Sequence, residues 1–269
     1  MAEMSFLLNF LFPPPPSVYL TTMSVISFTS LSYSGFSEVR GTHVQYSKFW
    51  NAAEKTKAST VMKLSSRTGM LLLYTPSFLA GLASLGLSFV DQRPRSILLC
   101  SALTVHFLKR VLEVLFVHKY SGGMDLDSAI VISLSYFLAT VNAIYAQHMT
   151  LGMPDPPLDL EYAGVVLFLV GIAGNYYHHL LLQKLRGRDD KGYKIPKGGL
   201  FGLVICPHYL FEIMGFVGIS FIAQTVFAFA FTLGTVGYLT GRSYATRKWY
   251  LSKFPNFPRE VKALFPFVF

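Results

Sequence analysis

The sequence predicts an all-α fold, a bundle of about seven helices that crosses a membrane several times. Of its 269 residues, 52% are hydrophobic and only 14% are charged, and the mean hydropathy is +0.44. This composition leaves too little charge to cover the surface of a soluble globule. Roughly seven mostly apolar stretches have the length of about 20 residues that a membrane-spanning helix needs.

The apolar stretches follow one another along the whole chain. The first stretch is rich in Ser and Thr. The last two stretches are separated by a single residue, so that Phe216 to Ile219 form an almost continuous apolar run. The predicted spans cover residues 17–35, 69–90, 96–117, 128–149, 162–183, 199–217 and 219–241. A natural division places the first span and its basic loop in residues 1–68 and the remaining membrane domain in residues 69–269.

Lys and Arg are distributed unevenly between the connections, which predicts the orientation of the chain. Six basic residues lie in each of 36–68, 184–198 and 242–269, and one lies in 118–127, whereas 91–95 has two and both 1–16 and 150–161 have none. Because basic loops are retained in the cytosol, and because these two groups alternate, we expect a lumenal N-terminus and a cytosolic C-terminus.

The composition also argues against several functions. The net charge is +9, but the basic residues lie between apolar stretches and do not line one polar face, so we expect no nucleic-acid partner. Cys100 and Cys206 both fall inside apolar stretches, which supports neither a disulfide framework nor a thiolate metal site. The seven histidines are mostly isolated, and we therefore expect no metal.

Ionisable residues in the third predicted span follow helical spacing. His106, Arg110 and Glu113 share one face of that helix. Charges within a membrane are costly and need partners or a function. One interpretation is an internal Arg110–Glu113 pair near the membrane surface, with Lys109 extending to the surface. The other is a polar cavity lined by this face.

Polar residues in the fifth predicted span form a second stripe. Asn175, His179 and Gln183 lie on one side of a helix with 3.6 residues per turn. Such a stripe is typical of a cavity wall or of a clamp between helices.

The connection that follows is rich in cations and glycines. It reads K-L-R-G-R-D-D-K-G-Y-K-I-P-K-G-G from Lys184 to Gly199, with six cations and two anions. Glycines allow a ligand to approach the backbone closely, so a phosphate-rich cofactor is one interpretation and the positive charge of any cytosolic loop is the other. No G-x-G-x-x-G follows a predicted strand, which excludes a Rossmann domain.

Specific motifs in the C-terminal half resemble a known family. The run R-G-R-D-D-K-G-Y-K-I-P-K-G-G-L-F-G-L-V-I-C-P-H-Y-L-F-E at 186–212, with R-S-Y-A-T-R-K-W-Y at 242–250 and the closing F-P-F-V-F, resembles the steroid 5α-reductase family. The run H-F-L-K-R-V-L-E-V-L-F-V-H-K-Y-S at 106–121 and C-P-H-Y at 206–209 resemble its trans-2-enoyl-CoA reductase branch. The resemblance covers about residues 70–269 and leaves the first 65 unmatched.

The resemblance implies a multi-pass enzyme of the endoplasmic reticulum membrane. Such an enzyme takes NADPH from the cytosolic side and reduces a carbonyl-conjugated C=C bond of a lipid substrate within the bilayer, a steroid enone or an enoyl-CoA. Enzymes of fatty-acid elongation are then expected as partners. Matching positions imply that the cofactor is contacted by Asn175, Arg186, Tyr193, Glu212, Arg242 and Tyr250. His208 stands where steroid reductases carry Asn, and Thr246 where they carry His.

The substrate end departs from the steroid reductases. Their Gln-Glu pair and their Tyr after the third-span His are replaced here by Leu73, Tyr74 and Phe107. In the enoyl-CoA reductase branch the proposed proton donor is the Tyr of a C-P-N-Y motif, assisted by a third-span Lys, and Tyr209 and Lys109 match these positions. We therefore expect Tyr209 as proton donor and Tyr74 or Lys109 as donors to the substrate carbonyl.

Two other interpretations remain open on the sequence. The loss of the Glu–Tyr pair is consistent with a membrane relative or scaffold that has lost catalysis. A methyltransferase with a related helical bundle and S-adenosylmethionine is the third. Cofactor binding separates them.

Overall fold

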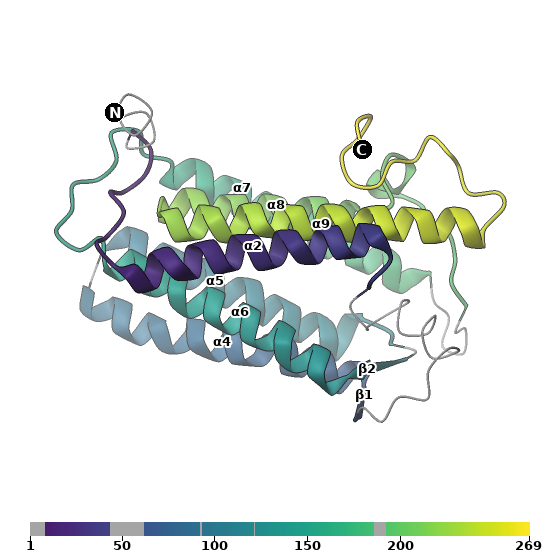
Figure 1. The fold of residues 1–269 in the computed structure, drawn as a ribbon, viewed down its shortest axis with the longest axis horizontal. Coiled ribbons are helices and arrows are strands. Elements are labelled where there is room, and N and C mark those ends of the chain that lie inside the picture. Colours follow the sequence, from purple (N-terminus) through teal and green to yellow (C-terminus); the bar gives the residue numbers. More distant parts are fainter. Residues whose placement is uncertain (1–8, 44–61, 92, 121, 186–191) are drawn as a thin grey trace.

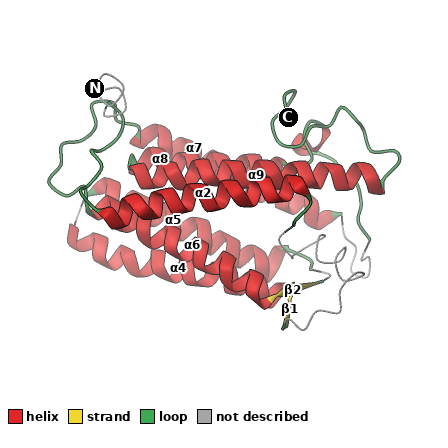
Figure 2. Cartoon of the chain, in the orientation of Figure 1, coloured by secondary structure: helices red, strands yellow, loops and turns green. Residues whose placement is uncertain are grey.

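The computed structural model describes residues 9–43, 62–91, 93–120, 122–185 and 192–269. Seven α-helices make up most of this described part, and they run along the long axis of an elongated bundle (Figures 1 and 2). They are α2 (Val18–Arg40), α4 (Ser66–Asp91), α5 (Pro94–Leu112), α6 (Leu126–His148), α7 (Glu161–Lys184), α8 (Pro207–Ala223) and α9 (Val226–Lys253).

Short elements lie at one end of the bundle. A π-helical turn, η1 (Glu113–Val117), continues α5, and a 3-10 turn, η2 (Gly199–Gly202), precedes α8. Two three-residue strands, β1 (Lys63–Ser65) and β2 (Gly123–Asp125), pair antiparallel with Leu64 opposite Met124. This small sheet joins the starts of α4 and α6.

Each predicted stretch overlaps one helix, and the prediction of a helical bundle is confirmed, since the described residues are mostly helical. Three helices there are long and apolar enough to cross a membrane, namely Ser66–Gly86 within α4, α6 and α7, and α8 is a shorter apolar helix. Seven crossings and the direction of the chain stay predictions.

The boundaries predicted for the last two spans were wrong. The expected spans were 199–217 and 219–241, whereas α8 begins at Pro207 and α9 continues to Lys253. The backbone of Gly198 and Gly199 is left-handed, with φ of 85° and 51°, and keeps this apolar segment out of the helix. Apolar residues before Pro207 are instead buried against a later segment, since the Ile205 amide donates to the Lys262 carbonyl at 2.9 Å. Hydropathy therefore identified burial there and not a helix.

Glycines let two helix pairs pack backbone to backbone. A Cβ on Gly171 of α7 would lie 2.4 Å from the Gly215 nitrogen of α8, and one on Gly35 of α2 would lie 2.3 Å from the Gly237 oxygen of α9. Small residues at such crossings are characteristic of membrane helices, whose association depends on close packing. The pairs α7–α8 and α2–α9 thus form one side of the bundle, and α4 packs on α5 and α6.

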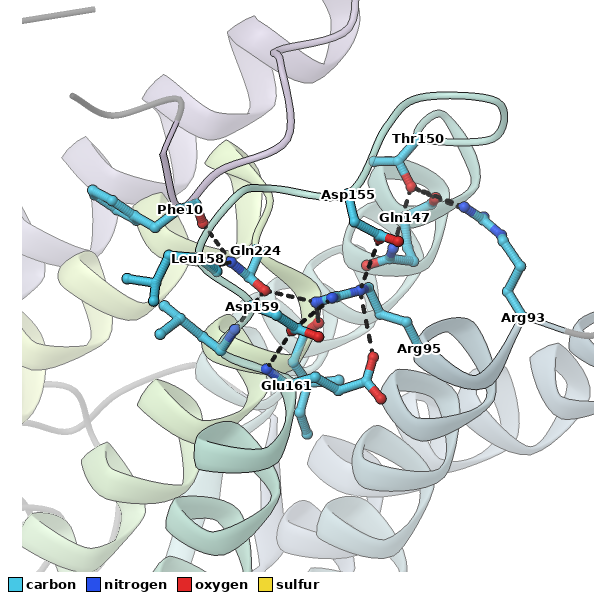
Figure 3. A network of polar contacts seen from close by, with 12 residues as sticks. Phe10, Arg93, Arg95, Gln147, Thr150, Asp155, Leu158, Asp159, Glu161 and Gln224 are labelled. Carbon is cyan, nitrogen blue, oxygen red and sulfur yellow. Dashed lines mark hydrogen bonds and ion pairs between the residues drawn. The ribbon is translucent and has the colours of Figure 1, made fainter. Parts of the chain in front are cut away.

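A polar network closes the end of the bundle at which α5, α7 and α9 begin (Figure 3). Arg95 donates to the Ile222 carbonyl at 2.9 Å, to Gln224 Oε1 at 2.8 Å and to Asp159 Oδ1 at 2.8 Å. Gln224 in turn donates from Nε2 to the Phe10 carbonyl at 2.7 Å. We call this end the Arg95 end, and the opposite end, where α5 and α7 finish, the cavity end.

Candidate active site

A cavity of about 290 Å³ opens at the cavity end, where η1, the end of α7, the start of α8 and the last turns of α9 meet. Its walls are rich in tyrosine, histidine and cationic side chains. Ten residues singled out in the sequence line it: Tyr74, Arg110, His179, Gln183, Tyr193, His208, Tyr209, Glu212, Thr246 and Tyr250. The tertiary structure thus brings together residues from α4, α5, α7, α8, α9 and the loop before η2.

Glu113 is the centre of a buried ionic cluster behind the cavity. Its side chain is 1% exposed, and its oxygens lie 2.9 Å from Lys109 Nζ, 3.2 Å from Arg110 Nη1 and 3.0 Å from His179 Nδ1. Glu113 begins the π-helical turn, a distortion often found at functional sites. The predicted Arg110–Glu113 pair is confirmed. Lys109 does not extend to the membrane surface, because the carboxylate holds its ammonium in the interior.

Two hydrogen-bond paths lead from this cluster to the cavity. Arg110 donates from Nη2 to the Tyr74 hydroxyl, and its guanidinium carbon lies 4.6 Å from the centre of the Tyr74 ring. Lys109 donates to Asn175 Oδ1, and Asn175 Nδ2 donates to the His208 carbonyl at 2.8 Å. Tyr74 and Arg110 therefore face the cavity directly, whereas Lys109 and Asn175 lie one layer behind its wall.

The first turns of α8 carry Tyr209 and Glu212 on the face that lines the cavity, because residues three apart lie on the same side of a helix. The Tyr209 ring lies 4.3 Å from that of His208, measured between centroids. Glu212 is 6% exposed and makes no hydrogen bond or ion pair with another residue of the described part of the chain. Its carboxylate lines the cavity and interacts electrostatically with the cations Lys109 and Arg110 of α5.

Aromatic side chains form the opposite wall. The Tyr250 hydroxyl donates to the Lys194 carbonyl at 3.3 Å, which ties α9 to the loop before η2. The Tyr193 ring lies 4.9 Å from that of Trp249, and Lys253 Nζ lies 5.0 Å from the Trp249 ring centre. This wall offers flat surfaces on which a ring system could stack.

The cationic residues of the two C-terminal motifs do not all lie at the cavity. Arg242 is 2% exposed and pairs with Glu38 of α2 at 2.6 Å, away from the cavity wall. Arg247 is engaged with the carbonyls of Val261 and Arg259, both at 2.7 Å. The described cations that line the cavity are Arg110, Lys119 and Lys194. Arg186, Arg188 and Lys191 lie outside the described residues.

One group of potential metal ligands lies beside the cavity. The ligand atoms of Glu113, His118 and His179 fall within 4.8 Å of one another. Lys109 and Arg110 already neutralise the same carboxylate, which disfavours a further cation. The absence of a metal stays a prediction. Burial, and then the nearby His179 and Arg110, lowers the pKa of His118 to about 3, so this imidazole is neutral near pH 7.

The sequence argument missed two cavity tyrosines. It placed Arg110 in an ion pair or on the wall of a polar cavity, but did not recognise it as the partner of Tyr74. Tyr136 lies in an apolar span without any polar pattern, yet its ring is 5.8 Å from that of Tyr74 and 5.5 Å from that of Phe107. Tyr120 follows η1 and lines the same wall. The ionisable stripe around Arg110 was a usable signal, whereas no signal identified the two tyrosines.

Comparisons with known proteins point to one family. The family model described as 3-oxo-5-alpha-steroid 4-dehydrogenase matches residues 129–269. A steroid 5-alpha-reductase of Gossypium hirsutum is 32% identical over 186 residues, which cover 65% of this chain and 71% of the relative. A 3-oxo-5-alpha-steroid 4-dehydrogenase 1 of Macaca fascicularis is 34% identical over 178 residues, 65% of this chain and 67% of the relative. A very-long-chain enoyl-CoA reductase of Dictyostelium discoideum is 31% identical over 173 residues, 64% of this chain and 57% of the relative.

Proposed function

Because the chain belongs to the 3-oxo-5-alpha-steroid 4-dehydrogenase family, we propose that it reduces a carbonyl-conjugated C=C bond of a lipid with NADPH. The relatives named above are steroid reductases and an enoyl-CoA reductase, so a 3-oxo-Δ4-steroid and a trans-2-enoyl-CoA are the two substrate types. The observation that carries the proposal is the buried Glu212 carboxylate in a cavity with aromatic walls, where Tyr209 lines the same face of α8 and the described residues supply no hydrogen bond or ion pair to the carboxylate.

The cavity wall suits a nicotinamide cofactor. When bound, NADPH supplies a hydride. We assign Glu212 to the carboxamide N–H of the nicotinamide, and Tyr193 and Tyr250 to the sides of the cofactor. Lys119 and Lys194 of the wall, with Arg186 of the preceding connection, suit its phosphates. Asn175 acts indirectly, because it holds the His208 backbone.

Two donors of this chain serve the substrate. Addition of a hydride at the β-carbon moves the π electrons onto the carbonyl oxygen, which needs a fixed hydrogen-bond donor. Tyr74 fills that role, with the adjacent Arg110 cation increasing the polarity of its hydroxyl. The resulting enolate takes a proton at its α-carbon from Tyr209, whose phenol is protonated at neutral pH. Lys109 holds this arrangement through Glu113 and Asn175 and is a positioning residue.

We also propose that the reaction takes place at the cytosolic side of the endoplasmic reticulum membrane. The cavity end carries the basic connections, which supports a cytosolic position for it in the endoplasmic reticulum membrane, with NADPH arriving from that side. A lipid substrate then reaches the cavity from the bilayer. Enzymes of fatty-acid elongation are partners only if the substrate is an enoyl-CoA.

The direct test is turnover by the purified full chain in detergent. NADPH and a panel of steroid enones and enoyl-CoAs are supplied, and loss of nicotinamide absorbance is followed. Tyr209→Phe should keep NADPH affinity and lower turnover about 100- to 10,000-fold, the range of a lost acid–base group. The exposed Tyr162→Phe is the matched control and should leave turnover unchanged.

Isotope effects distinguish the two tyrosines. In Tyr209→Phe protonation becomes slow, so heavy water should lower turnover more than in the parent protein. In Tyr74→Phe hydride transfer becomes slow, so deuterated NADPH should have the larger effect. The reverse pattern would exchange their roles. Binding of NADPH without turnover of any substrate would favour the second candidate, a non-catalytic relative, which the substitutions at Leu73 and Phe107 support.

A further inference from the structure

Exposed tyrosines lie at two levels of the bundle and mark where a membrane would begin and end. At the Arg95 end, Tyr19 and Tyr162 stand at the starts of α2 and α7, and Tyr145 near the end of α6, all three exposed. Towards the cavity end, Tyr177 and Tyr244 are exposed on α7 and α9. Tyrosines of this kind gather at membrane–water interfaces, with the ring in the lipid and the hydroxyl in the headgroup layer.

The spacing of the two levels fits a bilayer. Helix α9 begins at Val226, directly after Gln224 of the Arg95 network, and Tyr244 lies 18 residues further. At 1.5 Å per residue this is about 27 Å, close to the hydrocarbon thickness of about 30 Å. Tyr244 therefore lies at the interface of the cavity end. Lys248, exposed one turn beyond it, is placed to meet anionic headgroups.

The chain after α9 folds back to this level. Beyond Lys253 it returns beside α9 (Figure 1), and Arg247 of that helix donates to the Val261 carbonyl at 2.7 Å. Lys262 pairs with Val204 in a parallel bridge, and Leu264 is completely buried. This anchored segment ends in a turn in which the Phe269 ring stacks on that of Tyr244, with centroids 6.2 Å apart and planes at 19°.

The turn presents apolar side chains outward. It is closed by the Phe269 amide, which donates to the Phe265 carbonyl at 3.0 Å. Phe267, at its tip, has a φ of 65°, a conformation that side chains other than glycine rarely adopt. Phe267 and Val268 are each 80% exposed. Two adjacent large apolar residues held away from the protein form an exposed apolar patch, which is characteristic of a surface that contacts a membrane or a partner.

We propose that the turn Phe265–Phe269 is a membrane-interface anchor whose Phe267 and Val268 insert into the bilayer on the cavity side. The occupant is lipid because the Phe269 ring of the turn stacks on Tyr244, and the distance of Tyr244 from the start of α9 places it at the surface of a bilayer. The anchor fixes the segment that pairs with Val204 and Ile205, and Ile205 lines the cavity. It thereby holds the mouth of the cavity at the membrane surface, whichever reaction occurs there.

The test uses the full chain in vesicles of phosphatidylcholine and phosphatidylserine, with Cys100→Ala and Cys206→Ala to remove the native thiols. A nitroxide label is attached to Val268→Cys, which leaves Phe267 intact. Its collisions with oxygen, which concentrates in lipid, and with a water-soluble nickel chelate are measured. Leu233→Cys, exposed in the middle of α9, is the lipid control, and Glu260→Cys, exposed after α9, is the water control.

The label at 268 should collide with oxygen in preference to nickel, as at Leu233→Cys, and Phe267→Asp should shift it towards nickel. Free access of nickel, as at Glu260→Cys, would overturn the proposal. Protection from both reagents would also overturn it, because the turn would then be covered by protein. Neither result depends on turnover, so the anchor and the proposed reaction fail independently.

Discussion

Glu113 decides the arrangement of the polar residues behind the cavity. It is the shared partner of Lys109, Arg110 and His179, which come from two helices. Through Arg110 it fixes the hydroxyl of Tyr74, and through Lys109 it fixes Asn175. One buried carboxylate thus connects both paths to the cavity.

We predict that Glu113→Gln lowers both stability and turnover. Removing one charge of a buried ionic cluster leaves its partners uncompensated, which costs about 3–5 kcal/mol. The melting temperature should fall clearly, and turnover should fall at least about tenfold as Tyr74 loses its support. The exposed Glu260→Gln is the control for loss of one negative charge. Parent-like melting and turnover for Glu113→Gln would show that the cluster does not organise the site.

His118 gives the fold a dependence on pH. Its pKa is lowered from 6.5 to about 3 in the folded protein, first by burial and then by His179 and Arg110. Below about pH 6.5 the His118 imidazole therefore binds a proton in the unfolded chain but stays neutral in the folded chain. The stability contributed by the neutral imidazole is present above that pH and falls by about 1.4 kcal/mol per pH unit as pH decreases towards 3.

His118→Phe removes this titration. We expect its melting temperature to decrease less between pH 7 and pH 5 than that of the parent protein, and thermal unfolding at both pH values measures the difference. His148→Gln, at an exposed position at the end of α6, is the control. An unchanged pH response in His118→Phe would mean that other groups cause the acid sensitivity.

At the scale of helices, the α7–α8 contact sets the geometry of the site. Asn175 and His179 come from α7, and Tyr209 and Glu212 from α8. The distance between the two axes depends on Gly171, where a Cβ would lie 2.4 Å from the Gly215 nitrogen, a backbone atom that cannot move aside.

Gly171→Leu should separate the two helices. Overpacking of this kind costs about 1–3 kcal/mol or more, so melting temperature and turnover should both decrease. Gly86→Ala, in α4 with open space around the added Cβ, is the matched control and should be neutral or slightly stabilising. Full activity of Gly171→Leu would show that the cavity tolerates a wider α7–α8 contact.

At the scale of the whole molecule, the two ends of the bundle have different chemistry. The Arg95 end is a closed network of hydrogen bonds (Figure 3). The other end holds an open cavity with cationic walls. Uneven loop charge predicts that the Arg95 end is lumenal and the cavity end cytosolic.

A tag scan measures this orientation. A glycosylation acceptor inserted at 155 should be modified in the lumen, whereas one at 190 should not, and an impermeant thiol reagent should reach a cysteine at 190 from the cytosol. If both positions report the same compartment, α7 does not cross the membrane and the seven-span prediction is wrong.

Much of the architecture was determined by the sequence alone. Stretches of apolar residues indicated the number and order of the helices, because burial in lipid or protein needs apolar side chains at every turn. Short-range spacing also placed Tyr209 with Glu212, and His179 with Gln183, since residues three or four apart share a helical face. These inferences involve a single helix each.

Only the tertiary structure determined which polar and charged side chains of different helices pair with one another. The role of Arg242 at the cofactor stays a prediction, and its buried partner Glu38 is 204 positions away in the sequence, where no local pattern indicates it. Lys109 faces inward because Asn175 and Glu113 lie beside it, and Tyr74 meets Arg110 only after α4 packs on α5. Helical periodicity shows which face a residue occupies, whereas the partner on that face depends on which helices pack together, and long-range packing fixes that choice.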